Sequence, residues 1–506
     1  MSRWPVQPVI YEVNTVVWIR ELSRRYGREI TLGDVPDEAW DELALPGVDA
    51  VWLMGVWERS AAGLRIAQAD EGLRRSFREA LPDLRPGDVV GSPYCVRRYV
   101  VDAALGGPSG LAAARSALAR RRVRLLLDYV PNHVAPDNPW VAEHPEYFVG
   151  GDAADLGQTP PAFIEVGGNV LALGRDPYFA PWPDVVQLNA FAPRLRDATA
   201  EVLADIGSQC DGVRCDMAML LVNAVFARTW GERAGPPPQS EFWPLVIGQV
   251  RRQHPDMLFV AEAYWDMEWA LQQQGFDHCY DKRLYDRLLH DSPADVRAHL
   301  LADVSYQRRL LRFLENHDEP RAASTMPAPK ERAAAVAIAT LPGATLWHEG
   351  QFEGRRVRPP VFLARRPDEP ADADLRRFSH RLVDAVGATG MRGGEWRLLE
   401  CTGWPDNPTH DNLVAWCWQG HGRHLVVVNL SDRPAQARVR LPWTDLDGRR
   451  WRLTELLGDA EYEREGAEMT ESGLFVELDG WRWHLVSLTE AVPAEPAPEL
   501  VEGRAR

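Results

Sequence analysis

The feature that most constrains the fold is an alternation of short apolar runs with amphipathic stretches, which extends from residue 9 to about residue 390. Short apolar runs bounded by turn residues are typical of buried strands, and apolar residues three or four apart are typical of helices. Strands that alternate with helices form a parallel sheet. Eight such runs indicate an α/β fold, the closed (β/α)8 or TIM barrel. The predicted strands are residues 9–18, 48–57, 123–130, 212–218, 257–264, 276–281, 310–318 and 343–350.

Two long stretches interrupt this alternation. Residues 58–90 follow the second predicted strand, and residues 135–190, rich in Pro, Gly, Asp and aromatic residues, follow the third. Loops of this length inside a compact fold are usually functional. We therefore predict a barrel formed by residues 1–134 and 191–390, with residues 135–190 as an inserted domain B.

The helical pattern stops near residue 390, and short strand-like runs separated by turn residues follow it. This pattern predicts a C-terminal all-β domain of the sandwich type at residues 391–490. Residues 491–506 are rich in Pro and Glu and have little to bury, so we predict a disordered tail.

The composition narrows the classes of partner and the compartment. Lys and Arg total 57 against 73 Asp and Glu, and the net charge of −16 disfavours nucleic acid and anionic membranes. The chain shows neither the apolar run of a signal peptide nor a membrane span. Its six cysteines include no Cys-x-x-Cys pair, which favours buried thiols in a reducing compartment. These features predict a cytoplasmic protein with a neutral substrate, and they do not indicate an oligomeric state.

Polar side chains occur at the ends of several predicted strands. Arg214 and Asp216, in GVRCDMA, are two residues apart and therefore point to one side, where the guanidinium would keep Asp216 ionised. Glu262 ends an apolar run, where desolvation would raise its pKa. Taken alone, an Arg-x-Asp pair is more often a structural ion pair or a strand-end cap, and a lone Glu is more often leaving the sheet.

Two further strand ends carry the same kind of residue. Asp128 ends a run of three leucines and is followed by Asn132 and His133, and His317 and Asp318 close the seventh strand. Polar groups gathered at a strand end are costly without a polar ligand or water. In barrels the C-terminal strand ends hold the active site, so the four clusters are expected to meet there.

In this order, the four stretches resemble conserved regions of the α-amylase family, glycoside hydrolase family thirteen. The matching motifs are Asp128-Tyr-Val-Pro-Asn132-His133, Gly212-Val-Arg214-Cys-Asp216, Glu262, and Asn316-His317-Asp318. The resemblance covers the whole barrel, and it also implies the inserted domain and the C-terminal β-domain.

The resemblance implies a role for each residue of the site. Asp216 resembles the nucleophile, Glu262 the acid/base, and Asp318 the third carboxylate, which grips sugar hydroxyls more strongly in the transition state. Tyr94 resembles the tyrosine that stacks under the sugar being cleaved. Substrate contacts are further expected from Arg214, His133, His317 and Asp128.

The sequence also departs from the family. Met219 and Leu220 stand where many members have a Lys-His pair that contacts sugar and calcium, and Trp347 replaces a tyrosine-like position, which suggests different acceptor recognition. Although Asn132 stands where some members bind calcium, the other oxygen ligands cannot be assembled, and we predict no metal and no cofactor. We further hypothesise that residues 58–90 roof the substrate cleft.

These observations predict a retaining glycoside hydrolase that acts on an α-1,4-linked glucan or malto-oligosaccharide by double displacement. One alternative is a transglycosidase acting on α-glucan, maltose or trehalose-related sugars, since both classes share this machinery. Another is a non-catalytic glycan-binding barrel, which retention of all three carboxylates disfavours.

Overall fold

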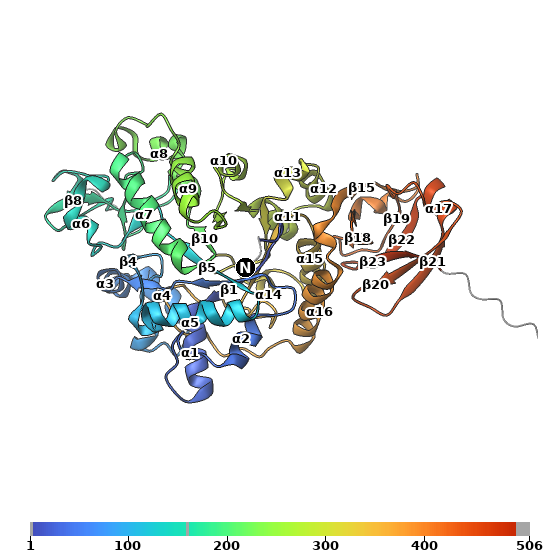
Figure 1. Ribbon diagram of the computed structural model, residues 1–506, viewed down its shortest axis with the longest axis horizontal. Coiled ribbons are helices and arrows are strands. Elements are labelled where there is room, and N and C mark those ends of the chain that lie inside the picture. Colours follow the sequence, from blue (N-terminus) through green and yellow to red (C-terminus); the bar gives the residue numbers. More distant parts are fainter. Residues whose placement is uncertain (1–3, 158–160, 492–506) are drawn as a thin grey trace, which may run out of the picture. The chain divides into compact units, whose positions relative to one another are not determined.

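The structure is a computed structural model that describes residues 4–157 and 161–491. The chain divides into two compact units, residues 1–388 and residues 389–506 (Figure 1). Apart from Ala491, the predicted disordered tail lies outside the described residues. Within the described ranges, no helix has the length and apolar character needed to cross a membrane.

The first unit contains a closed barrel of eight parallel strands, in which the strands follow one another around the barrel in sequence order. Each of the eight predicted runs contains one of them, so the predicted barrel is confirmed. The strands are β1 (Val9–Asn14), β2 (Ala50–Met54), β5 (Arg124–Tyr129), β10 (Gly212–Cys215), β11 (Leu258–Ala261), β12 (His278–Tyr280), β13 (Leu310–Arg312) and β14 (Ala344–His348).

Several strands are shorter than the apolar runs that predicted them. The run 9–18 leaves the sheet at Asn14, whose side chain accepts a hydrogen bond from the Val17 N–H and caps helix α1 (Thr15–Tyr26). Such an N-cap satisfies a backbone donor that the first helical turn leaves free. The apolar residues after Asn14 therefore belong to a helix, which periodicity over so short a stretch does not distinguish from a strand.

The interior of the barrel is filled by side chains from alternate positions of the strands. On β1, Ile10 and Glu12 face inward while Tyr11 and Val13 face the surrounding helices, as the two-residue period of a strand requires. The buried inward residues that close the barrel are Ile10, Ala50, Trp52, Met54, Leu126, Leu258, Val260, Tyr280, Leu311, Phe313, Ala344 and Leu346.

Amphipathic helices complete this unit. In α7 (Pro193–Gln209), Leu195, Thr199, Leu203 and Ile206 recur every three or four residues and are buried. The other helices are α2 (Asp37–Leu43), α5 (Gly107–Arg120), α8 (Asn223–Trp230), α9 (Phe242–Gln253), α10 (Glu268–Gln273), α11 (Lys282–His290), α12 (Pro293–Leu300), α13 (Val304–Gln307), α14 (Ala322–Thr325), α15 (Ala328–Thr340) and α16 (Ala373–Thr389).

The stretch after the second barrel strand forms a small layer of its own. Strand β3 (Trp57–Arg59) pairs with β4 (Val96–Val101), and helices α3 (Ala61–Ala69) and α4 (Glu71–Ala80) lie between them in sequence. Phe77 of α4 is buried against Phe362, in the loop that follows β14. The apolar face of this stretch therefore packs on that loop.

The stretch after the third barrel strand is tied together at its base. Strand β6 (His133–Val134) pairs antiparallel with β9 (Val186–Gln187), so the stretch leaves and rejoins the barrel at one place. It also contains α6 (Trp140–Glu143) and the hairpin of β7 (Phe163–Val166) and β8 (Asn169–Ala172). Its apolar cluster consists of Val134, Val141, Tyr147, Phe148, Leu171, Val186, Leu188 and Leu195.

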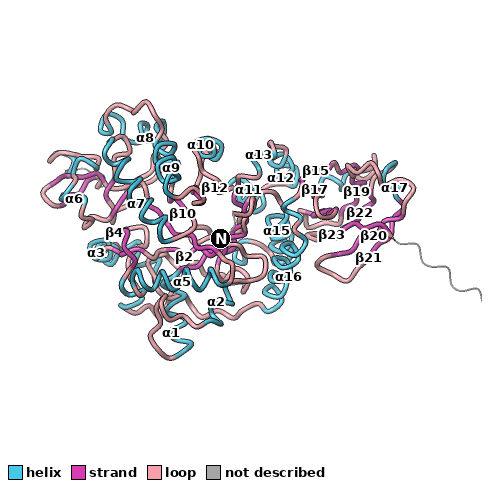
Figure 2. The backbone as a smooth tube through the Cα atoms, in the orientation of Figure 1, coloured by secondary structure: helices cyan, strands magenta, loops and turns pink. Residues whose placement is uncertain are grey.

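The described part of the second unit is built mainly from strands, and it includes a short α-helix, α17 (Gly466–Glu471), as Figure 2 shows in magenta and cyan. One sheet has the order β15-β17-β18-β23-β20-β21 and the other β16-β19-β22. The bounds are β15 (Glu395–Leu399), β16 (Cys401–Thr402), β17 (Leu413–Gln419), β18 (Arg423–Asn429), β19 (Ala435–Val439), β20 (Arg450–Glu455), β21 (Glu461–Glu465), β22 (Leu474–Leu478) and β23 (Trp483–Glu490).

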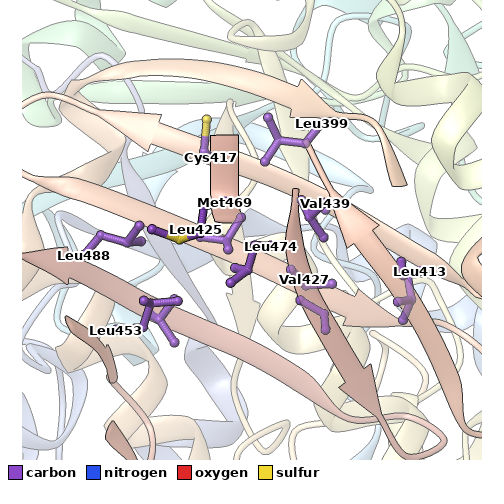
Figure 3. Packing of buried hydrophobic residues seen from close by; sticks show 14 of the residues in the cluster. Leu399, Leu413, Cys417, Leu425, Val427, Val439, Leu453, Met469, Leu474 and Leu488 are labelled. Atoms are coloured by element: carbon purple, nitrogen blue, oxygen red, sulfur yellow. The ribbon is translucent and has the colours of Figure 1, made fainter. Parts of the chain in front are cut away.

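Both sheets of this unit contribute to one apolar core. Leu425 and Val427 of the larger sheet pack with Val439 and Leu474 of the smaller one, and Met469 of α17 joins them (Figure 3). A core shared between two facing sheets defines a β-sandwich. The predicted C-terminal all-β domain is thus confirmed.

Candidate active site

The polar residues predicted at the strand ends lie together at the C-terminal end of the barrel. Asp128 of β5 and Arg214 of β10 are register partners on adjacent strands, and both point inward. Asp216 and Glu262 immediately follow β10 and β11, and His317 lies beyond β13. Because the strands are parallel, their C-terminal ends bring these residues to one end of the barrel.

Arg214 is the centre of the cluster and is only 1% exposed. Its Nη1 lies 2.6 Å from Asp216 Oδ1 and 3.8 Å from Asp128 Oδ1. Its Nη2 lies 2.8 Å from Glu262 Oε2. Burial would lower the pKa of Arg214, but the surrounding acidic groups, Glu262 foremost, outweigh it and raise the pKa. One permanent cation therefore holds the predicted nucleophile and the predicted acid/base as close neighbours.

Glu262 has an environment suited to holding a proton. Desolvation raises its pKa to about 7, against the opposing effect of Arg214 and with smaller contributions from Asp216 and Asp318. Its Oε2 accepts a hydrogen bond of 2.6 Å from the Met217 N–H, and its Oε1 one of 3.1 Å from the Tyr264 hydroxyl. A carboxyl group that titrates near neutrality can act as general acid and then as general base.

The donor to Glu262 comes from a strained turn. Met217 has a φ of 42°, a left-handed conformation that a side chain of this size rarely adopts. The turn follows directly after Asp216 and aims the Met217 N–H at the Glu262 carboxylate. Strained backbone of this kind is common at functional sites.

His317 and Asp318 form a second polar group. His317 Nε2 lies 2.9 Å from Asp318 Oδ2 and 2.7 Å from the Tyr94 hydroxyl, while its Nδ1 pairs with Glu12. Burial would lower the pKa of His317, but Asp318 and Glu12 outweigh it and raise the pKa well above its usual value. The imidazolium in turn overcomes the effect of desolvation on Asp318 and lowers the pKa of that carboxyl.

The exposure of Asp318 separates it from the other carboxylates. Its side chain is 45% exposed, whereas Asp216 and Glu262 are almost fully buried. The Asp318 N–H bonds the Asn316 side-chain oxygen at 2.9 Å, and Arg358 reaches the Asp318 main-chain oxygen. An ionised, accessible carboxylate in this position is able to accept hydrogen bonds from a polyhydroxylated ligand.

Tyr94, Asp128 and His133 line the same site. The Tyr94 ring stacks on His317 with 5.3 Å between ring centroids, and the Arg214 guanidinium lies 5.3 Å from the Tyr94 centroid. Desolvation raises the pKa of Asp128 to about 6, and its Oδ2 accepts a hydrogen bond of 2.9 Å from the Gly55 N–H. Burial lowers the pKa of His133, which therefore stays neutral near pH 7.

Glu12 is a site residue that the sequence analysis missed. It is fully buried at an inward position of β1, and its carboxylate pairs with His317 at the C-terminal end of the barrel. A carboxylate inside an apolar strand was the available signal, because such a group needs a partner. Its partner lies 305 positions away along the chain, so the pairing emerges only from the closed barrel.

The three residues that depart from the family pattern, Met219, Leu220 and Trp347, are all buried. Met219 and Leu220 are 0% and 2% exposed, so they contribute to packing. Trp347 is 2% exposed and packs edge-on against Phe352 on the outer face of the barrel wall. Trp347 therefore points away from the barrel interior, and the expectation that acceptor recognition differs stays a prediction.

No calcium site is apparent around Asn132. Gln187 Nε2 donates a hydrogen bond of 2.9 Å to the Asn132 side-chain oxygen, which would otherwise be available to a cation. Among residues 4–157 and 161–491, no cluster of three or more His, Cys, Asp or Glu is arranged to hold a metal ion. The residues present around Asn132 do not fit calcium.

The chain thus forms a (β/α)8 barrel with carboxylates grouped around a buried arginine at its C-terminal end. No family model matches the chain. Among curated proteins, it is 25% identical to an α-amylase of Haloarcula japonica over 410 residues, 75% of this chain and 52% of that protein. It is 29% identical to an α-1,4-glucan:maltose-1-phosphate maltosyltransferase of Burkholderia pseudomallei over 38% of this chain and 15% of that protein.

Solved structures share the fold over nearly the whole chain. A noncanonic maltogenic α-amylase of Thermotoga neapolitana superposes with a TM-score of 0.68 at 19% identity, covering 95% of this chain and 98% of that one. An α-amylase of Geobacillus thermoleovorans in complex with acarbose gives 0.66 at 17% identity, covering 97% and 100%. The predicted resemblance to the α-amylase family is confirmed, and no subfamily is identified. The chain spans about half the length of the first curated relative.

Proposed function

We propose that the protein is a retaining α-glycosidase of the α-amylase type that acts on an α-1,4-linked glucan or malto-oligosaccharide. The observation that carries this proposal is the bridging of Asp216 and Glu262 by Arg214, combined with a pKa of about 7 at Glu262. Retention requires two carboxyl groups only about 5 Å apart, one ionised and one protonated. Two carboxyl groups bound to the same guanidinium suit that requirement.

In the first step, Glu262 donates its proton to the glycosidic oxygen while Asp216 attacks the anomeric carbon. The bond to the leaving sugar breaks, and an ester to Asp216 forms. In the second step, Glu262 removes a proton from water, whose oxygen attacks the anomeric carbon and releases Asp216. Two inversions restore the original configuration.

The remaining residues position the sugar and tune the charges. Asp318 accepts hydrogen bonds from ring hydroxyls, and His317 keeps it ionised and oriented. Tyr94 offers an aromatic face beside the same group. Arg214 stabilises Asp216 as the departing carboxylate when the ester is broken.

The acceptor decides between hydrolase and transglycosidase, and the two curated relatives fall on either side of that division. We favour water as the acceptor and a neutral oligosaccharide as the substrate. Product analysis tests this: wild type and Glu262→Gln are incubated with maltodextrins, trehalose and sucrose, and the products are resolved by chain length over time.

Shorter sugars that accumulate with wild type only are the expected result. Longer or rearranged products would establish the transglycosidase instead. Undiminished turnover by Glu262→Gln would contradict the assignment of the acid/base, and binding without turnover by either protein would support a glycan-binding barrel.

We further propose a cytoplasmic location and a reaction that needs no metal or cofactor. All six cysteines are free and five of them are buried, which suits a reducing compartment. Activity that is unchanged after dialysis against a chelator is the expected result, and its loss and recovery with added calcium would contradict the metal-free proposal.

A further inference from the structure

A cavity of about 280 Å³ lies on the outer face of the barrel wall, between α1, α2, α16 and the loop after β14. Tyr11 of β1 lines it, whereas the next residue, Glu12, faces the barrel interior and pairs with His317. The cavity and the active site therefore lie on opposite faces of one strand. Its volume is close to the lower end of ligand pockets, about 300 Å³, so its occupant is small.

The Tyr11 hydroxyl is the group in this cavity that is available to a ligand. The residue is 6% exposed, and its ring packs 5.7 Å from the Phe352 ring centroid. The structure gives this hydroxyl no hydrogen bond within the described residues, and it does not belong to the fully enclosed polar atoms that lack a partner, so it opens onto the cavity. A hydroxyl that opens onto a cavity can bond water or the hydroxyl of a ligand.

Most of the charged groups around the cavity are paired with one another. Arg25 lies 2.9 Å from Glu42, Arg366 pairs with Glu349 and Glu21, and Arg376 lies 3.6 Å from Glu353. Arg355 also lines the cavity, where its side chain donates to the Glu369 main-chain oxygen and its Nε has no partner. With Arg355, four acidic and four basic side chains line the cavity, and this balance of charge favours a neutral ligand.

Hydrogen-bonding capacity nevertheless remains after these pairs have formed. An ionised carboxylate offers about four lone-pair positions, so Glu349 and Glu353 can each accept further bonds. The Tyr11 hydroxyl can donate one bond and accept others. This combination suits a neutral ligand that carries several hydroxyl groups, because each hydroxyl can both donate to a carboxylate and accept from the tyrosine.

We propose that this cavity binds a small neutral polyhydroxylated molecule, of the size of one monosaccharide, through the Tyr11 hydroxyl and the carboxylates of Glu349 and Glu353. The site is separate from the one that carries the proposed reaction. Its test therefore uses a chain in which that reaction is blocked, and it does not depend on the identity of the substrate.

The test is a calorimetric titration of Glu262→Gln protein with D-glucose, compared with the same protein carrying Tyr11→Phe. This substitution removes only the oxygen, which has no partner in the protein, so the midpoint of thermal unfolding should stay unchanged or rise slightly. The expected result is that one glucose-binding event weakens at least tenfold. Tyr94→Phe on the same background is the matched control, since it alters the barrel end and should leave that event intact.

Crystals soaked in glucose should show the sugar against Tyr11. Identical glucose binding with and without Tyr11→Phe would overturn the proposal, as would the absence of any event beyond the active site. Glycine and inorganic phosphate serve as charged probes, and binding of either one in place of glucose that depends on Tyr11 would also overturn it. A lower unfolding temperature for Tyr11→Phe would show that the hydroxyl has a structural partner.

Discussion

Arg214 lies close to three buried carboxylates of the site. Its guanidinium contacts Asp216 and Glu262 and lies near Asp128, all of which are buried. A buried charge that loses its partner is strongly destabilising because water cannot replace the lost interaction. Arg214 is therefore expected to support the fold as well as the proposed reaction.

Replacement of Arg214 by methionine should lower the free energy of unfolding at pH 7 by about 3–5 kcal/mol. The loss should shrink at acidic pH, where the stranded carboxylates can be protonated. Urea unfolding at both pH values measures this. Arg450→Met is the control, since that side chain is 58% exposed and solvent screens its ion pair, so its loss should change stability little. Equal losses for the two variants would contradict this account of Arg214.

Glu262 should set the alkaline limb of activity. As a general acid it must be protonated, so kcat/KM should fall as the pH rises through about 7. Glu262→Gln should lower kcat by about 10²- to 10⁴-fold and abolish that limb. Because the folded-state pKa is raised from 4.5 to about 7, this group's contribution to stability should also be lost as the pH rises between those values. A wild-type profile that stays flat from pH 5 to 9 would contradict the assignment.

Glu12 should act through His317 and not on the substrate. Loss of the Glu12 carboxylate removes a charge that favours the imidazolium, so Glu12→Gln should lower the pKa of His317. Histidine NMR titration measures that shift, and the pH profile of kcat/KM should change with it. Glu455→Gln is a matched control, because Glu455 pairs with His484 in the C-terminal unit and should leave the profile unchanged.

At the level of elements, the strands that carry the site were predictable because each is an apolar run followed by a polar residue. Their ends were less predictable, as Asn14 shows, since a capping side chain and not hydrophobicity ended the strand. The pairing of Glu262 with the Met217 N–H could not be predicted either. It depends on a left-handed turn at Met217, and methionine has no preference for that conformation. The outward direction of Trp347 could not be predicted either, because it depends on the register of β14.

Helix α4 packs against the loop that follows β14. Phe77 is 1% exposed and lies 5.6 Å from the Phe362 ring centroid, while Arg365 pairs with Asp83 and Asp88. The same loop carries Arg358, which reaches Asp318. The helical stretch therefore holds a loop that contacts the site, whereas the proposed roof over the substrate remains a hypothesis.

Phe77→Ala should loosen this arrangement. Truncation of a buried phenylalanine typically costs about 3–5 kcal/mol, and the freed loop should raise KM more than it lowers kcat. Chemical denaturation and steady-state kinetics measure the two effects. Arg78→Ala, at an exposed position of the same helix, should change neither, and a KM that is unchanged in Phe77→Ala would contradict the proposed link to Asp318.

At the level of the whole molecule, the division near residue 389 follows from two separate cores. The C-terminal unit buries its own apolar cluster between two sheets. A domain with its own core can fold alone. The change from helical to strand periodicity near residue 390 made this unit predictable, whereas the order of its strands was not, since it depends on long-range pairing.

Residues 389–491, expressed alone, should therefore unfold cooperatively with a β-type circular dichroism spectrum. Urea unfolding curves followed by circular dichroism and by tryptophan fluorescence that coincide would support this. Leu425→Ala, which removes a buried side chain of β18 from the core between the two sheets, should abolish the transition or lower its midpoint sharply. A non-cooperative melt of the unsubstituted fragment would contradict the independence of this core.

The central claim is that Asp216 forms a covalent bond to the sugar. A glycosyl fluoride carrying a second fluorine on the ring slows the release step and lets the ester accumulate. Mass spectrometry of the treated, digested protein measures which peptide gains one fluorinated sugar. The account predicts that label on Asp216, with none in Asp216→Asn protein. A label on another residue, or rapid turnover of the reagent by Asp216→Asn, would contradict it.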